Sequence, residues 1–344
     1  MIRFYLSADY HLRLTNSCGF MIDGVNSRLS DELKILSEMV NNAISHQING
    51  FIIAGDIFDK INPSEKLRKI FLRTVIIPLI KAKITVFILM GNHDTNFDVV
   101  SFETEAELAN VLLEDSIVFI TEPKIIDFGD CSIYFVPFGF DIPVNNEGCQ
   151  VIIGHHAIKG TETGVGVITR KGSVEVETSA FQHFQLAFFG HHHKPQQYYI
   201  GSPIRWDFGE RLDDKRYLLL EADNKEFKVT SIPIEDRRFV QLVFTEKDYG
   251  KEITSEMVAN AVVKLVFEGE SLWVKSIDVN AIKRQCEKAG AHKVFHEFKV
   301  AKVKKNLLID IKDTDSHEDV IVKYAEKQQI EQSLLDIGLK LFRE

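Results

Sequence analysis

The sequence has 344 residues, of which 45% are hydrophobic, and a formal net charge of −9. These values predict a globular protein with one large domain and a smaller one, and no apolar run approaches the roughly 18 residues of a membrane span. The first residues lack a cationic start and a cleavage site, and the four cysteines show no paired spacing, so we expect a cytoplasmic protein without a disulfide framework or a zinc knuckle. The acidic balance does not favour nucleic acid as a ligand, because phosphate-binding proteins usually present a basic face.

Five short apolar runs are each followed by an aspartate, an asparagine or a histidine. The clearest run, residues 51–53 (Phe-Ile-Ile), leads to Gly55 and Asp56, which places a carboxylate at the tip of a buried strand. Because parallel sheets bind ligands beyond the carboxyl ends of their strands, we expect these polar side chains to meet in one crevice. In chain order, the runs and their polar residues are 2–6 with Asp9 and His11, 51–53 with Asp56, 85–89 with Asn92 and His93, 151–153 with His155 or His156, and 186–189 with His191 and His193.

Helices and further strands are predicted between and after these runs. The helix at 64–80 carries more apolar residues than one core-facing stripe needs, which predicts either burial between a sheet and a loop or contact with a second copy of the chain. The expected elements up to residue 236 are a polar loop at 12–28, helices from Ser30 to about His46, at 64–80 and at 103–113, short strands near 118, 125 and 133–136, an exposed loop at 159–177, and strands at 216–221 and 227–232.

The character of the sequence changes near Arg237 and Arg238. The residues that follow predict a compact α+β module without any pattern of metal ligands, and then a helical tail at 320–342 made of one helix or two short ones. The tail has more apolar residues than one helical face needs, so it must fold onto the module or onto a partner, and we favour the partner. The expected elements of the module are strands near 240–244, 261–267 and 295–300 and a helix near 280–288.

The polar residues at the strand ends predict a site for two divalent metal ions. Carboxylate, amide and imidazole donors without thiolate suit Mn²⁺, Mg²⁺, Fe²⁺ or Zn²⁺. Two ions about 3.5–4 Å apart need a bridging carboxylate, for which Asp56 is the natural candidate, and together they can bind a phosphate group and lower the pKa of a water molecule. Hydrolysis also needs a proton for the leaving oxygen, and His93, between Asn92 and Asp94, fits the role of general acid. The site therefore predicts phosphoester hydrolysis.

These motifs resemble those of a known enzyme superfamily. Asp9-x-His11, Gly55-Asp56-x-x-Asp59, Gly91-Asn92-His93-Asp94, Gly154-His155 and Gly190-His191-x-His193 are similar to the five motifs of the calcineurin-like metallophosphoesterases. Within that superfamily, residues 200–203 (Ile-Gly-Ser-Pro) and 206–210 (Trp-Asp-Phe-Gly-Glu) resemble the SbcD-type DNA repair and recombination nucleases and their phage relatives. The resemblance covers roughly residues 1–235.

The resemblance implies a fold and three parts of the chain. The fold class is α/β, with a four-layer metallophosphoesterase sandwich in which two mixed sheets lie between helices. This nuclease domain would span residues 1–236. A small α+β capping domain that binds DNA would span 239–312, and a helical tail that binds an ATPase partner would span 313–344.

The resemblance also implies roles for the site residues. The cofactor would be two Mn²⁺, with Mg²⁺ as a substitute, and His93 would be the acid. Many relatives carry a second catalytic histidine where this chain has Asp59, which we expect to orient other groups rather than transfer a proton. His156 competes with His155 as a ligand. One ion would be held by Asp9, His11, Asp56 and His193, and the other by Asp56, Asn92, His155 and His191.

The partners implied are DNA, a second copy of the chain and an ATPase. The substrate would be double-stranded DNA ends, with single-stranded DNA as a further substrate, in the cytoplasm of a bacterium or a phage-infected host. The tail at 314–344 would bind the coiled coil of an SbcC-type ATPase, and helices near 64–80 and 98–113 would form a homodimer. Because the net charge is negative, DNA contacts must come from local basic clusters, which could equally be solvated surface. The candidates nearest the motifs are Arg170, Lys171, Lys194 and Arg205.

Two other functions fit part of the pattern. A phosphomonoesterase, a cyclic-nucleotide phosphodiesterase or a protein phosphatase could use the same ions. Protein phosphatases typically continue the Gly-Asp motif with Asp-Arg-Gly, whereas here Asp59 is followed by Lys60 and Ile61, which weakens that alternative. A scaffold that kept the fold without catalysis would commonly have lost ligands, and this sequence retains them all.

Overall fold

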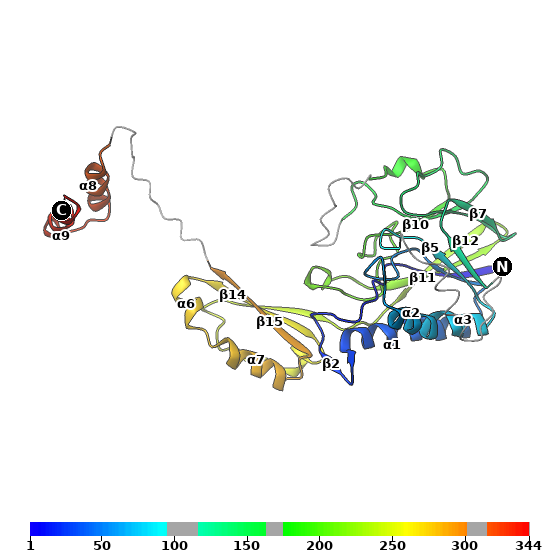
Figure 1. Cartoon of the computed structure of the whole chain (residues 1–344), viewed down its shortest axis with the longest axis horizontal. Coiled ribbons are helices and arrows are strands. Elements are labelled where there is room, and N and C mark those ends of the chain that lie inside the picture. The colour runs from blue at the N-terminus through cyan, green and yellow to red at the C-terminus, as the bar shows by residue number, and fades with distance from the viewer. Residues whose placement is uncertain (95–115, 163–174, 301–314, 344) are drawn as a thin grey trace. The chain divides into compact units, whose positions relative to one another are not determined.

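Two mixed β-sheets carry the polar strand ends. The computed structural model describes residues 1–94, 116–162, 175–300 and 315–343, so the predicted helix at 103–113 lies outside the described residues (Figure 1). The six strands of the first sheet, in spatial order, are β12 (Glu226–Pro233), β11 (Arg216–Asp223), β1 (Ile2–Ser7), β4 (Gly50–Ile53), β5 (Thr85–Leu89) and β6 (Ile117–Ile120). The four strands of the second are β10 (Leu186–Gly190), β9 (Val151–His155), β8 (Ser132–Val136) and β7 (Lys124–Asp127).

The centre of each sheet is parallel. Strands β1, β4, β5 and β6 run parallel in the first sheet, and β8, β9 and β10 run parallel in the second. Strands β11, β12 and β7 extend the sheets in antiparallel fashion. Residues of β4 are buried throughout, and parallel strands that are covered on both faces need continuous apolar runs of this kind. The five strands predicted to end in polar residues are therefore neighbours within their sheets.

The two sheets share one apolar core. Phe87 of β5 stacks on Phe135 of β8 with ring centroids 6.0 Å apart, and both rings belong to a cluster that includes Leu6, Ile52 and Ile153. Since side chains alternate between the faces of a strand, the opposite faces of the sheets need separate cover. This pairing brings the carboxyl edges of the two parallel centres together.

Helices cover the outer face of the first sheet (Figure 1). The first, α1 (Ser27–Ser45), begins three residues before the predicted Ser30, because Asn26 caps it by accepting a hydrogen bond from the Arg28 N–H. The predicted loop at 12–28 contains a hairpin of β2 (Met21–Ile22) and β3 (Val25–Asn26), whose last residue is this cap.

The predicted helix at 64–80 has three segments. It runs as α2 (Glu65–Phe71), a π-helical turn η1 (Leu72–Ile76) and α3 (Ile77–Lys81), starting at the cap residue Ser64. The wider π turn changes which side chains face the sheet. Most of the apolar residues that exceed one stripe are buried in the chain's own core, so their number no longer argues for a second copy of the chain. The buried ones are Leu67, Phe71, Leu72, Val75, Ile76 and Leu79.

The outer face of the second sheet has a different cover. Ile152 and Phe189 pack against Phe181 and Phe184, which follow a 3₁₀ turn, η2 (Thr178–Ala180). Within the described residues, this fourth layer is made of irregular chain and η2. The expected α/β sandwich with two mixed sheets is confirmed, and the ends of the predicted loop at 159–177 are joined by a bridge between Ile158 and Val176.

A third sheet forms the centre of the predicted module. Its strands are β13 (Phe239–Phe244), β14 (Val262–Gly269) and β15 (Lys293–Val300), in that order, and the helices of this region are α5 (Ser255–Val258), α6 (Ser271–Ser276) and α7 (Val279–Lys288). The tail holds two helices, α8 (His317–Lys327) and α9 (Gln332–Arg343), of which α8 begins with a capping box between Ser316 and Asp319.

The contacts divide the chain into two compact units. The larger comprises Met1–Phe267 and Asp278–Glu297, and the smaller comprises Glu268–Ile277 and Phe298–Glu344. The predicted boundaries at 236, 239 and 312 remain a prediction. Among the described helices, none combines the length and the apolar character that crossing a membrane demands.

Candidate metal centre

Loops at the carboxyl ends of β1, β4, β5, β9 and β10 bring the predicted polar residues together. Asp56 lies at the centre of this group: its Oδ2 is 3.5 Å from His11 Nε2 and 3.3 Å from His155 Nε2. One carboxylate oxygen therefore faces imidazoles that come from both sheets. The full group of side chains, called the metal cluster below, is Asp9, His11, Asp56, Asn92, His93, His155, His191 and His193.

The backbone around Asp56 is unusual. Asp9, His11 and Asp56 have φ angles of 57°, 47° and 55°, in the left-handed region that residues other than glycine rarely adopt. Gly55 has a φ of 92°, and a Cβ atom there would collide with the His155 ring. Strained backbone of this kind is typical of sites where side chains must converge.

Asp9, His11 and His193 lie on the β1 side of the cluster. Asp9 Oδ1 accepts a hydrogen bond of 2.9 Å from the His191 N–H, while its Oδ2 is buried without a hydrogen-bond partner. The Nε2 atoms of His11 and His193 lie 3.0 Å apart. A buried carboxylate oxygen without a partner and two imidazole nitrogens directed at each other fit a shared cation.

On the β5 side, the amide oxygen of Asn92 lies between two imidazoles. Asn92 Oδ1 is 3.1 Å from His155 Nε2 and 2.9 Å from His191 Nδ1. His155 Nδ1–H donates to the Ala54 carbonyl at 2.8 Å, so the Nε2 lone pair is directed at the cluster. The metal cluster therefore gathers around Asp56, and the division of its residues between two ions stays a prediction.

Two neighbouring histidines point elsewhere. His156 Nε2–H donates to the Phe140 carbonyl at 2.8 Å, so the structure brings His155 and not His156 into the cluster. His192 stacks on Tyr199 with ring centroids 4.4 Å apart, as expected for a residue between two that share a face.

His93 lies at the edge of the cluster, and a backbone carbonyl orients it. Its Nδ1–H donates to the Asp59 carbonyl at 2.8 Å, and its backbone N–H donates to Asp56 Oδ1 at 2.9 Å. The Asp59 carboxylate instead lies 3.4 Å from Arg13 Nη1. Asp59 thus contacts His93 through its backbone carbonyl, while its carboxylate pairs with Arg13, and its supporting role stays a prediction.

Asp94 joins two of the loops. Its Oδ2 accepts hydrogen bonds from the N–H groups of Asp56, at 2.6 Å, and Gly91, at 3.1 Å. Burial and the neighbouring Asp56 charge raise the pKa of Asp94 to about 7. Sequence reasoning noted Asp94 only as the neighbour of His93, although its place in the Gly-Asn-His-Asp motif was a signal.

Sequence reasoning did not assign a role to Glu210 and Lys215. Glu210 Oε1 accepts a hydrogen bond of 2.9 Å from His193 Nδ1, and its Oε2 lies 2.8 Å from Lys215 Nζ. Lys215 is buried and also donates to the His193 carbonyl at 3.0 Å. A carboxylate behind a metal-binding histidine fixes its tautomer and orientation. The only sequence signal was the run at 206–210, which contains Glu210.

Mutual contacts shift the pKa values in the cluster. Burial disfavours the charge of Asp56, but His155 and His11 outweigh it and lower the pKa of this carboxyl well below its usual range. Burial would lower the pKa of His155, but the Asp56 carboxylate raises it to about 9. Burial raises the pKa of Asp9 to about 6 and lowers that of His191 to about 3. Burial likewise opposes charge on Glu210, but His193 and Lys215 lower its pKa to about 2.

The donors of the cluster suit divalent ions that prefer oxygen and nitrogen. The described residues supply carboxylate, amide and imidazole donors at this place, and the four cysteines are buried thiols that take no part in it. In two groups of side chains, the possible ligand atoms all lie within 4.8 Å of one another. One group is His11, Asp56 and His93, and the other is Asp9, Asp56 and His155. Such a donor set is typical of Mn²⁺, Mg²⁺, Fe²⁺ or Zn²⁺.

The predicted DNA contacts differ in their surroundings. Lys194 is partly exposed and pairs with Glu162. Arg205 is mostly buried. Its guanidinium donates to the Asp236 carboxylate at 2.5 Å and to the Asp213 carbonyl at 2.6 Å, so its charge is already paired within the fold. Arg170 and Lys171 lie outside the described residues.

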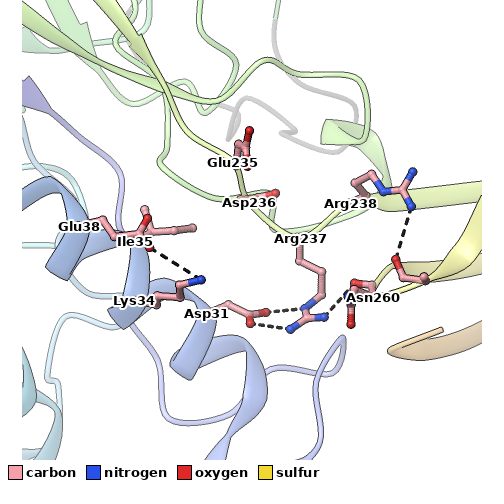
Figure 2. Close-up of a pocket in the computed structure, with 10 residues that line it drawn as sticks. Asp31, Lys34, Ile35, Glu38, Glu235, Asp236, Arg237, Arg238 and Asn260 are labelled. Carbon is pink, nitrogen blue, oxygen red and sulfur yellow. Dashed lines mark hydrogen bonds and ion pairs between the residues drawn. The ribbon is translucent and has the colours of Figure 1, made fainter. Parts of the chain in front are cut away.

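A separate pocket lies between α1 and the start of β13. It has a volume of about 420 Å³, and Figure 2 shows Arg237 on its wall donating to both carboxylate oxygens of Asp31, each at 2.6 Å. Its charged residues of both signs pair largely with one another, as Lys34 also does with Glu38 at 3.8 Å. The Arg237–Asp31 pair ties the segment before β13 to α1, and the described residues of the pocket offer no donor set comparable to the metal cluster.

The chain is similar to known proteins in sequence and, more weakly, in structure. Residues 2–195 match the family model described as calcineurin-like phosphoesterase. The chain is 24% identical over 292 residues to the SbcD component of the nuclease SbcCD from Staphylococcus epidermidis, covering 73% of this chain and 74% of that protein. It is 21% identical over 338 residues to "Exonuclease subunit 1" of Enterobacteria phage T4, covering 91% and 93%. A solved dimetal phosphatase from Danio rerio is 11% identical, covers 67% of this chain and 95% of its own, and has a TM-score of 0.41. With more than half of its length matched by the family model, the chain belongs to the calcineurin-like phosphoesterase family and is a metal-dependent phosphoesterase.

Proposed function

We propose that this chain is a DNA nuclease that hydrolyses phosphodiester bonds at DNA ends, in repair, recombination or replication. The observation that carries the proposal is the position of Asp56, whose Oδ2 faces His11 at 3.5 Å and His155 at 3.3 Å. A carboxylate between two groups of imidazoles is what a pair of divalent ions needs as a bridge. We assign two Mn²⁺ to the cluster, with Mg²⁺ as the substitute.

The cluster residues would divide between the two ions. When bound, two divalent ions neutralise charge on a phosphate group and activate the attacking water. Glu210 would hold the His193 ring with its Nε2 toward the ions, and Ala54 would do the same for His155 through its carbonyl. One ion would be held by Asp9, His11, Asp56 and His193, and the other by Asp56, Asn92, His155 and His191.

His93 is the group that we assign to the leaving oxygen. Its Nδ1–H bond to the Asp59 carbonyl fixes the ring and leaves Nε2 as the nitrogen that can carry the proton for the leaving oxygen. The N–H bond from His93 to Asp56 Oδ1 keeps the ring beside the cluster. His93 would donate its Nε2 proton to the departing oxygen, and Asp59 would position it through the backbone.

The relatives favour DNA over a small ester as the substrate. The two nucleases named above align with this chain over about three quarters or more of their length. Both alignments are longer than the match to the family model, so they also include a part of the chain outside the metal cluster. The cluster itself does not select an ester, so a phosphatase or a cyclic-nucleotide phosphodiesterase is the second candidate. Lys60 and Ile61 after Asp59 depart from the phosphatase motif and favour the nuclease.

The tail is the segment that we assign to an ATPase partner. On α9, Leu334, Ile337 and Leu341 are 59%, 56% and 69% exposed and recur three and four residues apart, so they form one apolar face. We propose that residues 314–344 bind the coiled coil of an SbcC-type ATPase, since the names of the relatives describe them as parts of larger nucleases. The capping domain at 239–312 and a homodimer through 64–80 and 98–113 complete the proposal and rest on the family resemblance.

Cleavage assays with the full chain test the function. The protein and Mn²⁺ are incubated with three substrates in turn: linear duplex DNA labelled at either end, a small phosphodiester and a phosphomonoester. In the control reactions a chelator removes the Mn²⁺. We expect cleavage of the duplex that depends on Mn²⁺ and is lost in Asp56→Asn. If the protein hydrolyses the small esters but leaves duplex DNA intact, both alone and with the ATPase, the result would favour a phosphatase or a cyclic-nucleotide phosphodiesterase.

A further inference from the structure

Arg13 lies beside the metal cluster and was not among the predicted substrate contacts. The segments 11–13 and 57–59 run side by side, because Leu12 donates a backbone hydrogen bond of 2.9 Å to one residue of the second segment and accepts one of 3.2 Å from another. Leu12 is fully buried in the core. His11, directly before Leu12, belongs to the cluster, and Arg13 directly follows Leu12.

The guanidinium of Arg13 packs over an aromatic ring. It lies 4.2 Å from the centroid of the Trp206 ring, and the Trp206 ring is perpendicular to His11 with centroids 6.3 Å apart. The His11 ring is in turn 4.8 Å from that of His93. Stacking on an aromatic ring restricts the orientation of an arginine without using its N–H donors.

Those donors are poorly satisfied within the described residues. A guanidinium carries five N–H donors, and the polar contact of Arg13 is the Nη1–Oδ1 distance of 3.4 Å to Asp59, which is long for a charge-assisted hydrogen bond. Its Nε is buried without a hydrogen-bond partner. Glu32 is a nearby carboxyl, but burial raises its pKa well above the usual range, which disfavours its charged form.

Other cations close to the cluster already have partners in the described part of the chain. Lys194 pairs with Glu162, Arg205 pairs with Asp236, and the buried Lys215 binds Glu210. Arg13 combines partial exposure, contact with the Trp206 ring and unsatisfied donors at the edge of the site. An arginine with these features suits bidentate recognition of a phosphate.

We propose that Arg13 binds a backbone phosphate of the DNA strand next to the scissile phosphate, and that this contact favours a polynucleotide over a small ester. The inference rests on the proposed nuclease function. A small diester has one phosphate, which the ions would hold, so it would gain nothing from Arg13. A polynucleotide presents a second phosphate one nucleotide away.

Salt-dependent DNA binding tests the proposal. Dissociation constants for a duplex oligonucleotide are measured from low to moderate salt in an Asp56→Asn background, so that the DNA stays intact. Arg13→Gln should weaken binding about tenfold at low salt and reduce the slope of log K against log salt by about 0.9, the value for one phosphate contact on duplex DNA. Arg13→Lys should keep the slope. Lys34→Gln is the matched control, because it also removes a cation with one loose ion pair, 3.8 Å from Glu38, and should change neither quantity.

A second measurement uses the unaltered Arg13. Neutral methylphosphonate groups are placed one at a time in the duplex, and one position beside the scissile phosphate should weaken binding about tenfold when Arg13 is present. That penalty should disappear in Arg13→Gln. The search for a sensitive methylphosphonate position uses the chain with Arg13 in place, so it tests the proposal even if Arg13→Gln does not fold.

Four results would overturn the inference or its basis. An unchanged salt slope in folded Arg13→Gln, or no sensitive methylphosphonate position, would exclude the phosphate contact while leaving the nuclease function intact. An equal loss of small-diester and DNA hydrolysis in Arg13→Gln, with Asp56 present, would mean that Arg13 supports the cluster instead. Hydrolysis of the small diester but not of DNA by the unaltered protein would reject the nuclease function itself.

Discussion

The hydrogen bond between Glu210 and His193 leads to a quantitative prediction about metal affinity. Glu210 uses both carboxylate oxygens: Oε1 accepts from His193 Nδ1 at 2.9 Å, and Oε2 accepts from Lys215 Nζ at 2.8 Å and from the backbone N–H of Trp206 at 3.1 Å. The amide in Glu210→Gln has only one acceptor oxygen, so either His193 or the Lys215 side must lose its partner.

The size of the effect follows from these contacts. Loss of the partner of a metal-binding histidine typically lowers metal affinity by about 10- to 100-fold, and we expect Mn²⁺ affinity to fall by about this factor. Lys215 is fully buried, and removal of the charge opposite it costs stability on the order of 3 kcal/mol. Asp213, whose Oδ2 is 3.4 Å from Lys215 Nζ, remains as a weaker partner and limits the loss.

Calorimetry measures both quantities. Mn²⁺ is titrated into the metal-free full chain well below the unfolding temperature, and the unfolding transition is recorded separately. Glu177→Gln is the control, because it removes an exposed partner of Lys159 and should leave Mn²⁺ affinity unchanged. A folded Glu210→Gln protein that binds Mn²⁺ as tightly as the unaltered chain would refute the reasoning.

Three further predictions concern the cluster and the tail. Asp56→Asn and His193→Ala should each abolish hydrolysis without unfolding the protein, since they remove loop side chains and not core packing; Mn²⁺-dependent activity in both would reject the metal assignment. His93→Ala should keep both ions but cut turnover by roughly 10²- to 10⁴-fold, whereas loss of bound metal would make His93 a ligand. Deletion of 314–344 should leave basal cleavage intact and abolish co-purification with the ATPase, and loss of folding would show that the tail belongs to the chain's own core.

The strand ends of the site could be predicted because their signals are local. A run such as residues 51–53 followed by Gly55 and Asp56 contains both the buried strand and the tight turn that the backbone needs. The two mixed sheets followed from the same runs together with the family resemblance. The chain therefore revealed which residues converge.

Contacts between distant segments could not be predicted in the same way. His155 and His156 are adjacent and chemically equal, and the choice between them depends on carbonyl groups of Ala54 and Phe140 in other parts of the chain. Asp59 contacts His93 through its backbone carbonyl, which side-chain chemistry does not indicate.

The same limit applies to the helical layer. The sequence pattern at 64–80 shows an excess of apolar residues but not the π-helical turn at Leu72–Ile76 that helps to direct them into the core. Asn26 likewise starts α1 ahead of Ser30, because this cap is the last residue of the hairpin.

Anomalous diffraction from crystals soaked in Mn²⁺ tests most directly whether Asp56 bridges two ions. The account predicts two manganese peaks about 3.5–4 Å apart, one on each side of the Asp56 carboxylate, with His11 and His193 beside one peak and His155 and His191 beside the other. A single peak, or two peaks of which only one lies next to Asp56, would contradict it.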